Sequence, residues 1–197
     1  MEINAAMVKD LRTRSGAGIM ECKQALKETS GDIEEAITFL RKKGLAKANK
    51  KAGRETGDGA IGSYVHPGNK IGVMVKINCE TDFVANTPDF QELVKDIAMH
   101  IAASRPRFVK REDVTQDILD KEKEIFADQA RESGKPEKII DKIVTGKMDK
   151  FYEENCLLEQ SFVKDTNISI QELIQQKIAI LGENIMVGAF TRYEISK

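Results

Sequence analysis

The residues whose types and spacing could do chemistry gather in one short stretch, Cys79–Val84. Cys79 offers a thiol, and Glu80 and Asp82 stand two positions apart, so their carboxylates could share one side of an extended chain. Two carboxylates alone do not define a metal site. No base or cation adjoins Cys79 in the sequence to lower the pKa of its thiol. An enzyme that uses these three residues is therefore one hypothesis, with a weak positive case.

Other signatures of catalysis are missing from the sequence. The two histidines, His66 in a predicted turn and His100 late in a predicted helix, suit polar surface or packing positions better than catalytic ones. The sequence contains neither a nucleophile elbow nor a His-Glu-x-x-His motif. Gly16-Ala17-Gly18 does not begin a phosphate loop, because no Gly-Lys-Ser/Thr follows it. We expect no catalytic residue, no metal and no cofactor.

Phe83 and Val84 follow the acidic residues, in what reads as a loop between a strand and a helix. A large apolar residue at such a position has two interpretations. Phe83 either folds back into the core beneath the helix, or it is an aromatic anchor that enters a pocket on a partner protein.

Residues 1–45 predict three short helices around a small core. The first runs from about Asn4 to Arg14, and Gly16-Ala17-Gly18 ends it. The apolar positions expected to face inward recur at helical spacing; they are Val8, Leu11, Ile19, Cys22, Leu26, Ile33, Ala36, Ile37 and Leu40. A domain of this size is marginal alone, so it is either a stabilising cap or a helical binding module.

The stretch 41–54 carries seven basic residues and no acidic one. It is either a solvated, partly helical linker, which we place at 46–58, or a contact for phosphate or an acidic surface. The second interpretation leaves an RNA-binding protein as an alternative. The whole chain weighs against it: 31 basic residues face 32 acidic ones, aromatic residues make up 6%, and tryptophan is absent.

Residues 59–197 predict an α+β core. Two strands, 60–65 and 71–77, flank a turn with Pro67, Gly68 and Asn69 and form a hairpin. A helix capped by Thr87 follows, and a charged pair of helices at about 111–158 predicts a protruding hairpin or arm. A helix over 170–181 and a strand over 185–195 complete a small antiparallel sheet with packed helices.

Composition points to a reduced setting away from membranes. Cys22, Cys79 and Cys156 are odd in number and widely spaced. No apolar run approaches the roughly 18–20 residues of a membrane span, and the N-terminus lacks the features of a secretion signal. We expect a cytoplasmic protein that contacts neither membrane nor nucleic acid directly.

Several segments together resemble one family. The segment Cys79–Ala85 (Cys-Glu-Thr-Asp-Phe-Val-Ala) closely resembles the signature of bacterial elongation factor Ts. Thr13–Leu26 resembles the N-terminal segment of that family, and Gly182–Ile185 and Phe190–Glu194 resemble its C-terminal end. The segments occur in the family's order and span essentially the whole chain, in a short form with a single core subdomain.

The resemblance implies a guanine-nucleotide exchange factor for elongation factor Tu, with no enzymatic reaction of its own. It implies a ubiquitin-associated-like fold for residues 1–45. The family's Thr-Asp-Phe-Val stretch matches Thr81, Asp82, Phe83 and Val84. By that match Phe83 is the wedge that disturbs the Mg²⁺ site of the GTPase, and Asp82 helps to position the loop. Lys23 is the corresponding contact of the N-terminal domain.

Two departures from the family pattern matter. Asn86 stands where the family often has a basic residue, which removes one charged contact. Longer members carry two similar core subdomains, whereas this chain has one. The resemblance therefore implies a homodimer that binds two GTPase molecules. We expect the dimer surface around Ile185–Ile195, while the arm at 111–158 is an alternative contact.

Overall fold

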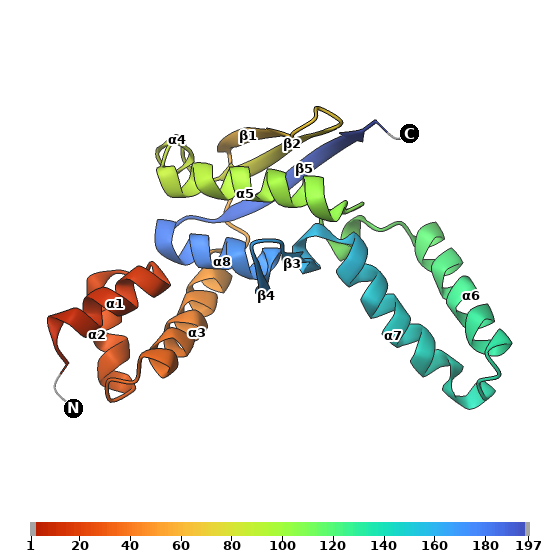
Figure 1. Cartoon of the computed structure of the whole chain (residues 1–197), viewed down its shortest axis with the longest axis horizontal. Coiled ribbons are helices and arrows are strands. Elements are labelled where there is room, and N and C mark those ends of the chain that lie inside the picture. The colour runs from red at the N-terminus through yellow and green to blue at the C-terminus, as the bar shows by residue number, and fades with distance from the viewer. Residues whose placement is uncertain (1–2, 196–197) are drawn as a thin grey trace. The chain divides into compact units, whose positions relative to one another are not determined.

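The N-terminal part of the protein is a pack of three helices (Figure 1). The computed structural model describes residues 3–195. The three helices are α1 (Ala5–Ser15), α2 (Ile19–Glu28) and α3 (Ile33–Lys51). Gly16 adopts a left-handed φ of 66° and ends α1, and the Asp32 carboxylate accepts a hydrogen bond from the backbone N of Glu35 at 2.8 Å and caps α3. The predicted three-helix arrangement is confirmed, and its likeness to ubiquitin-associated domains stays a prediction.

The core of this pack differs from the expected one at its edge. Its fully buried residues are Leu11, Cys22, Ala25, Leu26 and Ala36. Ile19 was expected inside, but it is the first residue of α2 and 55% of its surface is exposed. α3 continues through most of the basic stretch to Lys51, in agreement with the partly helical segment that its alanines and lysines predict.

The predicted hairpin and the predicted late strand together form a three-stranded antiparallel sheet. Its order is β1–β2–β5, and its strands are β1 (Asp58–Val65), β2 (Ile71–Cys79) and β5 (Ile185–Glu194). The turn closes with a hydrogen bond from the backbone N of His66 to the carbonyl of Ile71, at 2.9 Å. The side chains of Val73, Val75 and Ile77 are buried on one face, as their alternation predicts.

The described chain divides into two compact units, and the division passes through the sheet. The first unit comprises the described residues up to Ala60, Ile77–Val94 and Glu172–Met186. The second comprises Ile61–Lys76, Lys95–Gln171 and the described residues from Val187 onward. The predicted domain limits at residues 45 and 58 stay predictions.

Helices α4 (Asp82–Ala85), α5 (Pro88–Ser104) and α8 (Ile170–Leu181) follow the strands. The hydroxyl of Thr87 accepts a hydrogen bond from the backbone N of Phe90 at 3.3 Å, which confirms the predicted cap of α5. Within the first unit, Lys177 pairs with Asp89 at 2.8 Å and joins α8 to α5. α3 also approaches α8 closely, because a Cβ added at Gly44 would lie 3.3 Å from the Cβ of Ala179.

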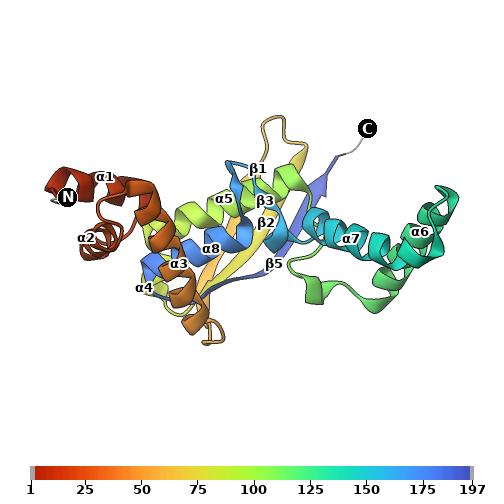
Figure 2. The same cartoon turned by 90° about the horizontal axis from the view of Figure 1, so that it is seen from below.

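The second unit contains the helical hairpin of α6 (Gln116–Glu132) and α7 (Glu137–Asn155), which lie side by side in Figures 1 and 2. Gly134, with a φ of 72°, and Pro136 make the break between them. Lys147 of α7 stacks over the ring of Phe126 of α6. The remaining short elements are η1 (Arg111–Asp113), η2 (Leu157–Glu159), β3 (Ser161–Phe162) and β4 (Asp165–Ser169).

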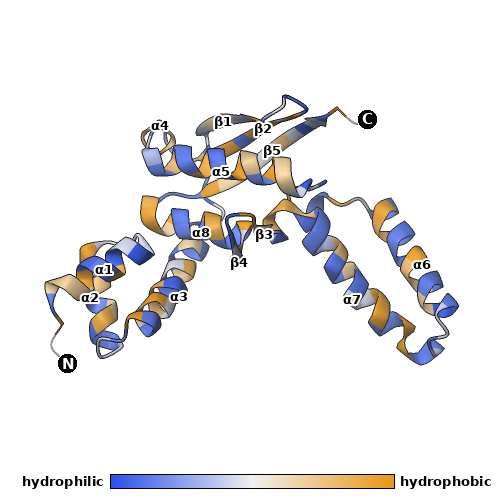
Figure 3. Ribbon diagram, viewed as in Figure 1, coloured by the Kyte–Doolittle hydropathy of each residue, from blue (hydrophilic) through white to orange (hydrophobic). Residues whose placement is uncertain are grey.

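These elements confirm the predicted α+β class. Apolar and polar residues alternate along α6 and α7 (Figure 3), as in helices that bury one face and leave the other in water. Over the described residues 3–195, every helix is too short or too polar to cross a membrane.

Candidate protein-binding site

The segment that carries Phe83 is a single helical turn, α4, rather than the predicted loop. The turn forms because Thr81 is extended and its carbonyl accepts a hydrogen bond from the backbone N of Ala85 at 3.2 Å. Val84 and Ala85 face inward and are buried. Phe83 faces the other way, with 82% of its surface exposed. The structure therefore favours the anchor interpretation over burial of this ring.

Glu183 holds the start of α4 from the far end of the sequence. Its carboxylate accepts hydrogen bonds from the backbone N of Glu80 at 3.1 Å and from the backbone N of Thr81 at 3.0 Å. It also accepts one from the Thr81 hydroxyl at 2.6 Å. Charge-assisted hydrogen bonds of this kind are among the stronger ones in proteins.

Glu80 in turn binds the segment that carries Glu183. The carboxylate of Glu80 accepts a hydrogen bond from the backbone N of Asn184 at 2.7 Å, and it pairs with Arg54 at 3.5 Å. These contacts, led by the backbone bond from Asn184, lower the pKa of Glu80. The side-chain amide of Asn184 donates to the carbonyl of Arg54 at 2.9 Å. We call Arg54, Glu80, Thr81, Glu183 and Asn184 the Glu183 cluster.

The other residues predicted at the site lie apart from this cluster. Asp82 is exposed, and its backbone carbonyl accepts a hydrogen bond from the side chain of Asn86 at 2.9 Å. Within residues 3–195, the hydrogen bonds at the start of α4 come from Glu183 and not from the carboxylate of Asp82. Lys23 is exposed on α2. The structure brings Thr81–Val84 together on one turn and places Lys23 on a separate element.

Sequence reasoning gave no role to Glu183. Gly182–Ile185 stood out only as one of the segments that resemble the family. The hydrogen bond from the backbone N of Thr81 to the carboxylate of Glu183 spans 102 positions. No local pattern reports a partner at that separation. The available signal in the sequence was that an acidic residue, Glu183, directly follows Gly182, where a helix is predicted to end.

The enzyme hypothesis finds little support in the surroundings of Cys79. The thiol is buried and donates a hydrogen bond to the carbonyl of Thr81 at 3.1 Å. Burial raises the pKa of Cys79, and the nearby carboxylate of Glu183 acts in the same direction. A thiol in such surroundings stays protonated at neutral pH and is a poor nucleophile.

The contacts of the two histidines suit structural roles rather than catalysis. His66 is exposed in the hairpin turn and lies 3.1 Å from the hydroxyl of Tyr64. His100 is fully buried: its Nε2 lies 3.0 Å from the side-chain oxygen of Gln160, and its Nδ1 accepts a hydrogen bond from the backbone N of Val163 at 3.3 Å. We call the side chains of His100 and Gln160, together with the backbone N–H of Val163, the His100 cluster. Within the described residues, no three histidine, cysteine or acidic side chains lie together as a metal would require.

Several residues of the basic stretch have partners inside the chain. Lys43 donates to the side chain of Gln24 at 2.9 Å, and Lys47 forms an ion pair with Glu21. Lys51 donates to the carbonyl of Gly182, next to the Glu183 cluster. These side chains are engaged within the fold, which weakens the phosphate-contact interpretation of the stretch.

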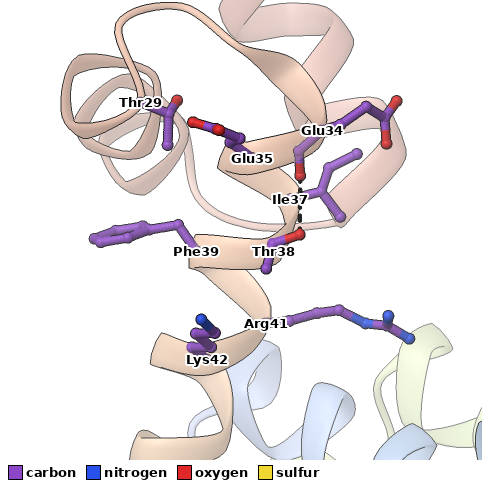
Figure 4. A pocket seen from close by; sticks show the side chains of 8 residues that line it. All are labelled: Thr29, Glu34, Glu35, Ile37, Thr38, Phe39, Arg41 and Lys42. Carbon is purple, nitrogen blue, oxygen red and sulfur yellow. Dashed lines mark hydrogen bonds between the residues drawn. The ribbon is translucent and has the colours of Figure 1, made fainter.

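A hollow of about 540 Å³ lies on α3 (Figure 4). Its lining mixes charged, polar and apolar side chains: Thr29, Glu34, Glu35, Ile37, Thr38, Phe39, Arg41 and Lys42. Phe39 and Arg41 point to opposite sides of the helix in Figure 4. The hollow therefore spreads around the helix surface and does not enclose a ligand.

Comparison with known proteins identifies the family. A family model described as Elongation factor TS matches residues 2–197. The chain belongs to the elongation factor Ts family. Elongation factor Ts of Fervidobacterium nodosum is 59% identical over 197 residues, which cover all of both chains. Elongation factor Ts of Geobacter metallireducens is 56% identical over 197 residues, which cover all of this chain and 91% of the relative.

The match to elongation factor Ts extends to relatives of the same length. The protein of Thermosipho melanesiensis is 57% identical over 195 residues, which cover 99% of this chain and all of the relative. The resemblance read from the sequence is thus confirmed, and this chain is a translation elongation factor by family.

Proposed function

We propose that this chain is a guanine-nucleotide exchange factor that promotes release of GDP from elongation factor Tu during translation elongation. The observation that carries the mechanism is the exposed ring of Phe83 on the firmly held turn α4, in a chain of the elongation factor Ts family. In this mechanism α4 enters the GTPase and Phe83 disturbs its Mg²⁺ site. Asp82 makes polar contacts with the partner beside Phe83, while Thr81 and Val84 fix the turn.

The physical basis is the charge on the bound nucleotide. Mg²⁺ neutralises phosphate oxygens in a GTPase and bridges them to the protein, so its displacement weakens nucleotide binding without breaking a covalent bond. A factor that binds the nucleotide-free state better than the GDP state shifts the population toward release. Because the coupling is reciprocal, a new nucleotide in turn releases the factor. Such a protein needs no catalytic residue of its own and is not an enzyme.

We assign a second contact to the N-terminal helices. Lys23 is exposed on α2, close in sequence to Met20, whose surface is 76% exposed. Met20 and Lys23 stand three positions apart on α2, so their side chains share one helix face, and exposed methionine is enriched in protein interfaces. This contact would add affinity for elongation factor Tu, whereas Phe83 would act on the nucleotide.

The test is the rate at which fluorescent GDP leaves elongation factor Tu in the presence of Mg²⁺. The wild-type chain should accelerate release strongly, and Phe83→Ala should reduce that acceleration at least tenfold, or about 1.4 kcal/mol. Val163→Ala is the matched control, because it also trims an exposed apolar side chain, on the turn between β3 and β4. It should exchange as the wild type does.

Two outcomes would contradict the proposal at different levels. Full acceleration by folded Phe83→Ala would keep the exchange role and move the mechanism to other contacts, with Lys23→Ala as the next variant. No acceleration by the well-folded wild type would reject the exchange role and return attention to RNA binding by residues 41–54.

We also propose a homodimer that binds two molecules of elongation factor Tu. The support is a set of exposed apolar side chains in the second unit, on the face of the strands opposite to Val73 and Val75: Ile61, Val65, Met74, Tyr193 and Ile195. The burial pattern of β5 changes phase at Gly188–Ala189, which turns Tyr193 to this face. This surface includes part of the Ile185–Ile195 segment expected from the sequence.

The molar mass in solution tests the dimer. Light scattering of the wild type should give about twice the mass of the chain, 22.0 kDa. Met74→Glu places a charge on the apolar face and should give the monomer. Val163→Glu adds the same charge on another exposed site and should leave the mass unchanged. A wild-type monomer at high concentration would reject this part of the proposal.

A further inference from the structure

α4 is too short to keep its own shape. A helix of four residues makes very few internal hydrogen bonds, and starting a helix is unfavourable because several backbone angles are fixed for each bond gained. Its geometry must therefore come from contacts outside the turn. On the C-terminal side, the side-chain amide of Gln91 donates to the carbonyl of Ala85 at 2.7 Å. On the N-terminal side, the contacts come from Glu183.

The contacts of Glu183 act on the residue that sets the direction of α4. Thr81 is the last extended residue before the helix, with φ −135° and ψ 158°. Glu183 binds both its backbone N and its hydroxyl, and the Thr81 carbonyl accepts from Cys79 and from the backbone N of Ala85. The conformation of Thr81 is thus fixed on both sides, two residues before Phe83.

Glu183 is itself held in place. The backbone N of Asn184 donates to Glu80, and the side chain of Asn184, which is only 6% exposed, donates to the carbonyl of Arg54. Two segments more than 100 positions apart therefore exchange hydrogen bonds in both directions. Such reciprocal bonding removes freedom from both segments at once.

We propose that Glu183 is the positioning residue that pre-organises Phe83 for insertion into its partner. The inference rests on the proposed function for the identity of that partner, elongation factor Tu. A ring that is oriented before binding loses less conformational freedom on insertion, so more of the contact energy acts on the bound nucleotide. Glu183 contributes to exchange through Phe83 and makes no contact of its own with nucleotide or metal.

The first test needs no partner. The chain lacks tryptophan, so Phe83→Trp introduces a single fluorescent reporter on α4. Time-resolved anisotropy should show at least twice the amplitude of fast motion when Glu183→Ala is added. Glu183→Gln should restore the slow motion, because its amide oxygen can accept both backbone N–H groups while its NH₂ donates to the Thr81 hydroxyl.

The controls separate motion of α4 from general loosening. Glu55→Ala removes an exposed carboxylate of the same unit and should leave the anisotropy unchanged. Urea unfolding of each variant checks that the chain is folded. Should Glu183→Ala not fold, Thr81→Val deletes only the hydroxyl contact and should give a smaller increase in fast motion. Unchanged anisotropy in folded Glu183→Ala would overturn the inference.

The second test is a double-mutant cycle on GDP release from elongation factor Tu. Glu183→Ala alone should lower the maximal acceleration about tenfold, and Glu183→Gln should recover most of it. In a Phe83→Ala background, Glu183→Ala should change the rate less than twofold, because its effect passes through the ring. A further tenfold loss in that background would show that Glu183 acts elsewhere and would overturn the inference.

The two tests keep this inference separate from the proposed function. If the wild type does not accelerate GDP release, the exchange role fails, and the anisotropy still decides whether Glu183 orders α4. If the wild type accelerates release and the anisotropy of folded Glu183→Ala is unchanged, the exchange role holds and the positioning role fails.

Discussion

The Glu183 cluster and the His100 cluster both join segments far apart in the sequence, and they do so with different chemistry. The Glu183 cluster uses carboxylates in half-buried positions, next to an exposed aromatic ring. The His100 cluster uses the uncharged side chains of His100 and Gln160, which are almost wholly buried, and burial lowers the pKa of His100. Its amide, Gln160, donates in turn to the carbonyls of Glu154 at 2.7 Å and Ser104 at 3.3 Å.

The difference indicates that the orientation of the Phe83 ring and the stability of the fold depend on separate clusters. A buried neutral network is costly to break, since each orphaned group stays away from water. When the partner of a half-exposed carboxylate is removed, water can hydrate the carboxylate again. The loss of that hydrogen bond therefore costs less stability. We therefore expect changes in the His100 cluster to act on folding and changes in the Glu183 cluster to act on exchange.

The largest predicted effect is on the His100 cluster. His100→Ala should lower the free energy of unfolding by about 3 kcal/mol, through a cavity and the loss of partners for Gln160 and Val163. Urea unfolding measures this loss. GDP release by the folded fraction should stay at the wild-type rate. His66→Ala, at the exposed histidine, is the control, and an equal loss of stability there would remove the contrast.

A pH titration of stability should separate the two clusters. The pKa of His100 is lowered in the fold from the ordinary 6.5, so the unfolded chain binds a proton first as the pH falls. The contribution of His100 is full above pH 6.5 and is lost as the pH falls below it. A proton on Nδ1 would also meet the N–H of Val163, donor against donor. Asp96 and Lys164 form an ion pair beside this cluster.

The Glu183 cluster should respond only at lower pH. The pKa of Glu80 is lowered from the ordinary 4.5, so its contribution is present above pH 4.5 and is lost as the pH falls through its folded value. Unfolding by urea at pH 7.5, 6 and 5 should show the His100 step, and His100→Gln should abolish it. A pH-dependent loss between 7.5 and 5 that persists in His100→Gln would contradict the assignment.

A smaller loss of stability is expected at Thr81. Thr81→Val keeps the shape and removes the hydroxyl bond to Glu183, which should cost about 1 kcal/mol in unfolding free energy. Because Thr81 also sets the direction of α4, the acceleration of GDP release should fall by a larger factor than the loss of unfolding free energy alone would cause. Thr81→Ser retains the hydroxyl and is the matched control. If both variants exchange at the wild-type rate, the hydroxyl contact does not contribute to placement.

The smallest effect is predicted for Arg54. Its ion pair with Glu80 is long, at 3.5 Å, and water reaches it, so the attraction is largely screened. Arg54→Ala keeps the backbone carbonyl that accepts from Asn184. The urea midpoint and the exchange rate should both stay unchanged. A clear fall in either would mean that the charge itself, and not the backbone contacts, holds the cluster.

Local patterns predicted most of the fold. Alternating Val73, Val75 and Ile77 gave the hairpin, and Thr87 and Asp32 marked helix starts that the structure confirms. Errors arose where local rules were incomplete. Ile19 has the spacing of a core residue but lies at the exposed start of α2.

The site was only half visible in the sequence. Phe83 stood out because a large apolar residue is unusual in a predicted loop between a strand and a helix, while the helical form of its segment did not. The carboxylate that binds Thr81 at the start of α4 lies 102 positions away, and periodicity carries no information at that distance. The same distant residue also bears on Cys79, whose thiol pKa is raised mainly by burial and further by the nearby carboxylate of Glu183.

That distance has a consequence for the newly made protein. Ribosomes add residues one at a time, and domains begin to fold while the chain is still growing. The buried core of helices α1–α3 lies within the first 40 residues and can form early, whereas α4 lacks its contacts with Glu183 until residue 183 has been synthesised. The positioning role proposed for Glu183 therefore predicts that Phe83 of a nascent chain is not held in its proposed orientation for exchange until the Glu183 segment has left the ribosome.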